Sequence, residues 1–157
     1  MLKIIAGVDL CQVEGIREIS CLEIISELGT DMGKWADVKH IAAWLNVAPN
    51  TKISGGKIIS SKMVKKKNYA GQTFRMCANS LTKSKSPLGD YSRKMKSKLG
   101  KKAGNVAVAH KIVRIVYTML KNKCEYNPEI IFKSQEKWKE KKIAYLEKQI
   151  IQLKMAI

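Results

Sequence analysis

The sequence predicts a mainly helical protein with at most one small β-hairpin. Apolar residues recur three or four positions apart in most segments, and glycine or proline separates these segments. Only the stretch near residues 52–60 departs from this pattern, with isoleucines on both sides of a Ser-Gly-Gly sequence, which fits a hairpin or an ordered loop. The chain has 157 residues and 45% hydrophobic content, enough for one domain or a domain with an appendage.

Residues 7–29 resemble a helix-hairpin-helix. A short helical piece is expected to end near Val13, Glu14–Arg17 would form the turn, and a second helix would end at Gly29. The face of this second helix is expected to carry Ile19, Leu22, Ile25 and Leu28. Such a hairpin offers backbone N–H groups to a DNA phosphate, which makes Gly15 and Arg17 candidate contacts. An ordinary helical hairpin around a core explains the same pattern.

Residues 30–125 are expected to form a basic helical domain. Asp37 can cap a helix that carries Ile41, Trp44 and Leu45 and that Pro49 ends. A later helix should place one group of residues near one face, namely Tyr69, Phe74, Cys77 and Leu81. Ser86 and Pro87 should begin the next helix, which stops at Gly100. The most apolar helix follows, with its buried face at Val106, Val108, Ala109, Ile112, Val113, Val116, Met119 and Leu120.

Residues 126–157 are expected to form a long polar C-terminal helix. Its apolar positions are spaced 3, 4, 3 and 4 apart, as in a coiled coil: Ile143, Leu146, Ile150, Leu153 and Ile157. This seam fits dimerisation, and it equally fits docking on the chain's own domain.

The positive charge is concentrated in the middle of the chain. Net charge is +17, and among residues 50–123 Asp90 is the only acidic residue. Such a block repels itself unless it meets a polyanion, so nucleic acid is the expected partner. An anionic membrane fits less well, because the lysines are not confined to one face of an apolar helix. With no apolar run long enough for a signal peptide or a membrane span, we expect a cytoplasmic protein.

The sequence offers little for metal or nucleotide chemistry. The four cysteines lack the spacing of a zinc site, and the basic region has too few carboxylates for magnesium. No Ser-His-Asp order is visible, and Gly-Gly-Lys lacks the upstream glycine of a P-loop. We therefore expect no metal site and no cofactor in these residues.

The stretch from Asn50 to Lys67 places serines beside glycines and many lysines. A serine there could attack a phosphodiester if cations stabilised the developing charge and a base activated the hydroxyl. The candidate cations are Lys52, Lys57, Lys62, Lys65, Lys66 and Lys67, and Gly55 and Gly56 permit close approach of another backbone. A flexible phosphate-contacting loop is the alternative. Arg75 is a further candidate contact to nucleic acid.

Five collinear blocks resemble one family. They are GVDLCQVEGI, ISELGTDMGKW, KHIAAWLNVAPNTKISGGKIISSK, SLTKSKSPLGDYSRKMKSKLG and AHKIVRIVYTMLKN. Their order and spacing are similar to the C-terminal domain of insertion-sequence transposases of the IS one-ten, one-sixteen and nine-oh-two type. The similarity covers roughly residues 5–125 and extends loosely into the tail.

The resemblance implies DNA recombination by a composite site. In the family, a RuvC-like domain with four acidic residues binds Mg²⁺, and the C-terminal domain supplies a serine that becomes joined to DNA. The SGG block puts this nucleophile at Ser54, with Ser61 in reserve. A structured guide RNA would select the DNA, so its sequence is not encoded in these residues. The family forms dimers and tetramers, and its prokaryotic members act at the nucleoid.

The chain departs from the family pattern in ways that affect activity. It opens shortly before the block GVDL, and the RuvC-like acids are not among its residues, so we expect no catalysis without them. Arg17 and Asn46 stand where a small residue and a glycine are usual. Two alternatives stay open: a non-enzymatic nucleic-acid-binding module, such as an inactive transposase remnant, and a helical oligomerisation protein.

Overall fold

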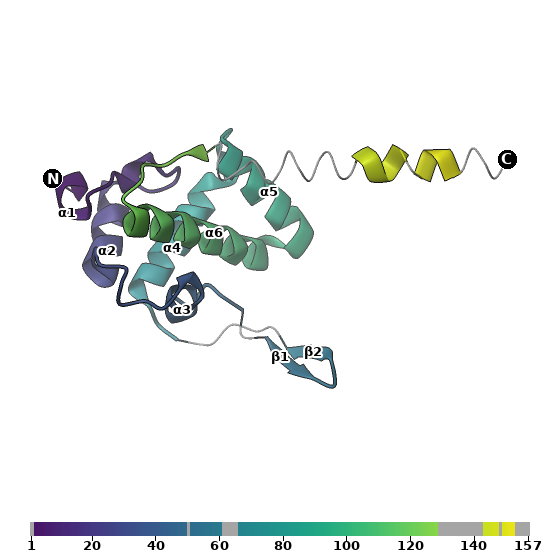
Figure 1. Ribbon diagram of the computed structural model, residues 1–157, viewed down its shortest axis with the longest axis horizontal. Helices are drawn as coiled ribbons and strands as arrows, with labels where there is room; N and C mark the ends of the chain where they lie inside the picture. The colour runs from purple at the N-terminus through teal and green to yellow at the C-terminus, as the bar shows by residue number, and fades with distance from the viewer. Residues whose placement is uncertain (1, 50, 61–65, 129–142, 148, 153–157) are drawn as a thin grey trace. The chain divides into compact units, whose positions relative to one another are not determined.

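The protein is described by a computed structural model covering residues 2–49, 51–60, 66–128, 143–147 and 149–152. Its residues form two units, Met1–Tyr126 and Asn127–Ile157. The described part is mainly helical, with one two-stranded antiparallel hairpin, which confirms the predicted fold class (Figure 1).

Helix α6 (Lys101–Asn122) is the centre of the first unit (Figure 1). It packs against α5 (Pro87–Leu99), α4 (Tyr69–Ser80) and α3 (Val38–Trp44). The predicted apolar face is buried at Val108, Ala109, Ile112, Val113, Val116, Met119 and Leu120, whereas Val106 is only partly covered. Ile115 and Tyr117 are buried as well, because neighbouring elements cover more of the helix than one stripe.

Local signals fix where several helices begin. The Asp37 carboxylate accepts hydrogen bonds from the backbone N–H groups of Lys39 and His40, and the Ser86 hydroxyl accepts one from Gly89, as predicted. Asn68 caps α4 in the same way by accepting from Gly71. Helix α3 ends at Trp44, before the predicted stop at Pro49, and Asn46 adopts a left-handed φ of 54° just after it.

The N-terminal elements are α1 (Leu2–Ala6), the 3₁₀ turn η1 (Leu10–Gln12) and α2 (Glu18–Leu28). The predicted face of α2 was half wrong: Ile25 and Leu28 are buried, but Ile19 is 75% and Leu22 is 56% exposed. The buried side turns toward Cys21 and Ile24 because α4 packs there. Tyr69, expected near the same face of α4 as Phe74 and Cys77, is exposed, whereas those two side chains are buried.

A second 3₁₀ turn, η2 (Leu81–Lys83), links α4 to α5. In the second unit, residues 143–147 and 149–152 are helical, and Ile143, Leu146 and Ile150 are exposed. Leu153 and Ile157, the other predicted seam positions, lie outside the described residues.

Replacing Gly104 by alanine should test how closely α5 and α6 approach. A Cβ at Gly104 would lie 2.5 Å from the Cα of Lys96, so the two backbones would have to separate. Alanine normally stabilises a helix interior by about 1 kcal/mol over glycine. Here we expect Gly104→Ala instead to lower the free energy of unfolding by about 2 kcal/mol, as overpacking does.

Urea denaturation would measure this change, with Thr118→Ala on the exposed side of α6 as the control. A Gly104→Ala chain as stable as the unchanged one would contradict the close packing.

Candidate nucleic-acid interface

The hairpin consists of β1 (Lys52–Ser54) and β2 (Lys57–Ser60), joined by Gly55 and Gly56. The two glycines have φ of +55° and +75°, as a two-residue type I′ turn requires, and glycine takes these values most easily. Ser54 pairs with Lys57 at the closing end, and the register is irregular between Lys52 and Ile53. The predicted hairpin is therefore confirmed, and Ser54 is the last strand residue before its turn.

Ser54 is exposed, and it is paired with the cationic residue Lys57 across the hairpin. The side chains of Lys52 and Lys57 in the hairpin, and of Lys66 and Lys67 after it, are also exposed. Ser61, Lys62 and Lys65 lie outside the described residues. Within the described part of the chain, the Ser54 hydroxyl has no hydrogen-bond partner, and no cluster of three or more His, Cys, Asp or Glu side chains could hold a metal ion.

In the turn between η1 and α2, Gly15 packs closely against α4, whereas Arg17 is exposed to solvent. Gly15 has a φ of +90°, and a Cβ there would lie 2.8 Å from the carbonyl oxygen of Cys77 in α4. This close packing gives the glycine a structural role. Arg17, the residue before α2, is exposed and makes no side-chain capping hydrogen bond.

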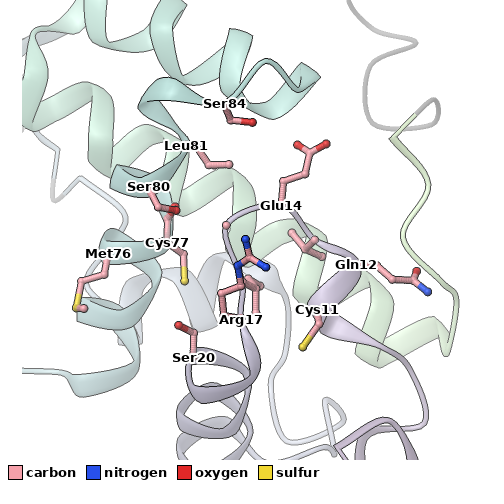
Figure 2. A pocket seen from close by; sticks show the side chains of 13 residues that line it. Cys11, Gln12, Glu14, Arg17, Ser20, Met76, Cys77, Ser80, Leu81 and Ser84 are labelled. Carbon is pink, nitrogen blue, oxygen red and sulfur yellow. The ribbon is translucent and has the colours of Figure 1, made fainter.

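A groove of about 610 Å³ lies between this turn and the C-terminal end of α4. Figure 2 shows Glu14, Arg17 and Ser20 on the side of the turn and α2, facing Met76, Ser80, Leu81 and Ser84. The groove forms because α2 and α4, far apart in the sequence, pack together.

Arg75 is tied into the fold. Its Nη1 donates to the carbonyl oxygen of Asn46 at 3.1 Å, and Asn105 donates to the Arg75 carbonyl oxygen at 2.9 Å. The side chain is half-buried, so it joins α4 to the end of α3. The guanidinium of Arg75 therefore has a structural role, because it donates a hydrogen bond to a carbonyl oxygen just after the end of α3.

A basic surface absent from the residue-level predictions lies on η2, α5 and the start of α6. This α5–α6 basic surface consists of seven exposed side chains: Lys83, Lys85, Arg93, Lys94, Lys98, Lys101 and Lys102. Asp90, the one acid in this segment, pairs with Arg93. The signal was present in the charge of residues 50–123, but only the turn at Gly100 brings the ends of α5 and α6 together.

The electrostatics of this surface favour an anion. Burial lowers the pKa of Lys96, and the positive charge of Lys101 lowers it further. Like charges are thus close enough to disfavour each other's protonation. A polyanion along this surface would relieve that repulsion.

Comparison with known families decides the assignment. Residues 9–93, more than half of the chain, match the family model described as the transposase IS116/IS110/IS902 family. The chain belongs to this transposase family. The matched span includes the Gly15 turn, the hairpin with Ser54 and most of α5. Comparisons with curated proteins and with solved structures give no match.

Membership implies a role in DNA transposition and hence DNA binding by this transposase domain. None of the helices within the described ranges is long and apolar enough to cross a membrane.

Neutralising part of the α5–α6 basic surface should weaken DNA binding and its dependence on salt. Each phosphate contact contributes about one unit to the slope of log K against log salt concentration. We expect the triple change Lys98→Gln, Lys101→Gln and Lys102→Gln to reduce this slope by about two to three. Fluorescence anisotropy with a labelled DNA duplex at several salt concentrations would measure it.

The matched control is the triple change Lys34→Gln, Lys39→Gln and Lys121→Gln. These lysines are exposed too, but they lie in the acidic N-terminal part and at the far end of α6. Equal loss of slope in both triples would show that only total charge matters.

Proposed function

We propose that this transposase domain supplies Ser54 as the nucleophile of DNA strand exchange and holds the DNA backbone with its surrounding cations. The observation that carries the proposal is the exposed Ser54 hydroxyl, placed beside a Gly-Gly turn and opposite Lys57. The two glycines leave the turn without side chains, so a phosphate backbone can come close.

The proposed reaction transfers one phosphoryl group from a deoxyribose oxygen to the serine. The Ser54 Oγ forms a bond to phosphorus, and one P–O bond to deoxyribose breaks. The hydroxyl proton passes to a base, and the leaving oxygen takes up a proton. Lys52 and Lys57 would stabilise the charge that develops on the phosphoryl oxygens.

The activating base must come from outside the described residues. A serine hydroxyl is a weak nucleophile unless a base or metal takes its proton, and Ser54 has no partner within the described part of the chain. We propose that a RuvC-like domain holds the Mg²⁺ of the composite site, as the family resemblance implies. In this proposal the transposase domain provides half of a composite site.

A structured guide RNA is the second proposed partner. Between residues 51 and 102, the exposed cations of the described part fall into two groups on different elements, the hairpin with Lys66 and Lys67, and the α5–α6 basic surface. Contacts to the phosphate backbone carry no sequence information, so the choice of a DNA target requires another component that recognises the bases. A guide RNA that pairs with DNA would supply it. The competing function is a nucleic-acid-binding module without chemistry, which shares every feature except a reactive Ser54.

A covalent adduct separates these two functions. We expect the domain, combined with a RuvC-like partner, Mg²⁺, guide RNA and labelled DNA, to form a protein–DNA adduct that survives denaturing electrophoresis. Ser54→Ala should abolish it because the attacking oxygen is gone, with at least a hundredfold loss of adduct on the order expected for removing a nucleophile.

Ser60→Ala, in the paired strand, is the control and should leave the adduct intact. If Ser54→Ala still forms adduct and Ser61→Ala does not, the nucleophile is Ser61. Tight DNA binding without any adduct would favour the binding module.

Oligomerisation through the tail is the third part of the proposal. The register places Ile143 and Ile150 at a positions and Leu146 at a d position, a combination that favours parallel two-stranded coiled coils. These three side chains are exposed, and Lys142 and Glu147 fall at the flanking g and e positions, where opposite charges attract.

Leu146→Glu should convert a dimer of the full chain to monomers in sedimentation equilibrium, because it puts a charge into the apolar seam. Tyr145→Glu makes a like change at an exposed position outside the seam and should leave the dimer unchanged. A chain that is monomeric before any substitution would refute self-association of the tail.

A further inference from the structure

The β1–β2 hairpin has no hydrophobic core of its own. Each residue from Thr51 to Lys57 is exposed, and the side chains of Ile53 and Ile59 are 65% and 69% exposed. A two-stranded hairpin is marginally stable by itself in water and normally needs a further strand or a packed helix. Since the described residues leave these two isoleucines uncovered, a binding partner of the hairpin is indicated.

The base of the hairpin is fixed to the helical unit. The Nδ2 group of Asn46, just after α3, donates a hydrogen bond to the Lys66 carbonyl oxygen at 3.3 Å. The Nδ2 group of Asn68 donates to the Trp44 carbonyl oxygen at 3.2 Å. These two bonds join the segment that enters the hairpin to the segment that leaves it. At the tip, a Cβ on either glycine would meet nothing within 4 Å apart from its chain neighbours, so the tip is open.

The two faces of β1 differ in chemistry. Successive side chains of a strand point to opposite faces, so Lys52 and Ser54 share one face and Ile53 lies on the other. Lys57, which pairs with Ser54 across the hairpin, lies on the same face as Ser54. The hairpin therefore presents cations and a hydroxyl on one face and an exposed apolar side chain on the other.

A partner of the hairpin must offer negative charge and apolar surface close together. The stretch Asn50–Lys67 contains six lysines and no acidic residue, so it favours a polyanion. Nucleic acid combines a phosphate backbone with bases whose faces are apolar, but in a paired duplex the neighbouring bases cover those faces. They become accessible where the strands have separated. Isoleucine is among the apolar side chains that proteins insert at unstacked base steps.

We propose that the hairpin acts as a wedge in an opened DNA duplex, with its cationic face on the backbone of one strand and Ile53 against an unstacked base. The inference rests on the proposed function and names the form of DNA that the domain takes. A guide RNA can pair with DNA only where the DNA strands are apart, so an opened duplex suits the proposed choice of target. The same placement would bring Ser54 to the backbone of the strand that the lysines hold.

Duplexes with and without a central stretch of unpaired bases test the wedge. Fluorescence anisotropy with the full chain should show the duplex with unpaired bases binding about tenfold tighter, because the unstacking that the wedge needs is already present. Ile53→Thr should remove most of this difference, since threonine keeps the branched Cβ that suits a strand but lacks the apolar end of isoleucine. Lys57→Gln should weaken both duplexes by a similar factor, because it removes a backbone contact.

Ile19→Thr is the matched control, because Ile19 is 75% exposed on α2, outside the hairpin. It should leave the difference between the two duplexes unchanged. Circular dichroism of each variant checks that the helices are intact. The comparison of the two duplexes with the unchanged chain is itself a test that needs no variant.

The outcomes separate the wedge from the proposed function. Equal binding of the two duplexes by the unchanged chain, or a preference that survives in Ile53→Thr, would overturn the wedge and leave the proposed function standing. An Ile53→Thr chain that keeps the preference and yet loses the covalent adduct would assign this isoleucine to a contact with the RuvC-like partner instead. Absence of binding to any DNA would overturn the proposed function, and the wedge with it.

Discussion

The burial of α6 between α3, α4 and α5 is the constraint on which the rest of the first unit depends. Ile112 and Val113 in the middle of this helix are almost completely removed from solvent. At two contacts the backbones approach so closely that only glycine fits: a Cβ at Gly71 would lie 2.0 Å from the Leu45 carbonyl oxygen, and one at Gly104 would strike α5. The apolar core therefore fixes the positions of the helix ends, among them the ends of α5 and α6 that carry part of the basic surface.

The same core stabilises the fold against the repulsion among its many positive charges. Residues 50–123 carry 19 basic side chains and one acidic side chain, a net charge of +18, so they account for the whole positive excess of a chain with net charge +17. Burying α6 stabilises the fold through apolar area, which scales at about 25 cal/mol per Å². The lysines are left on the outside, as at Lys98 and Lys101, where water and salt screen their repulsion. A stable apolar interior thus allows an exterior that is specialised for a polyanion.

Local features of the fold were predictable from the sequence, whereas features that depend on the packing partner were not. The caps at Asp37 and Ser86 and the turn at Gly55 involve residues within a few positions of each other, so short patterns suffice. The exposure of Ile19 depends on where α4 lies against α2, which periodicity alone leaves open. The groove escaped prediction for the same reason: it pairs Arg17 with Ser80, more than sixty positions apart.

The separation of cations from acids has a chemical consequence for the proposed reaction. Ser54 is paired with Lys57 across the hairpin and has no base within reach in the described part of the chain. Carboxylates placed permanently beside Lys52 and Lys57 would pair with them and reduce their attraction for a phosphate. In the proposed reaction, activating acids carried by another domain would leave the cations of this one available to DNA. The serine would then stay unreactive until DNA and the acidic domain meet at the hairpin, and assembly would control when the strand is cut.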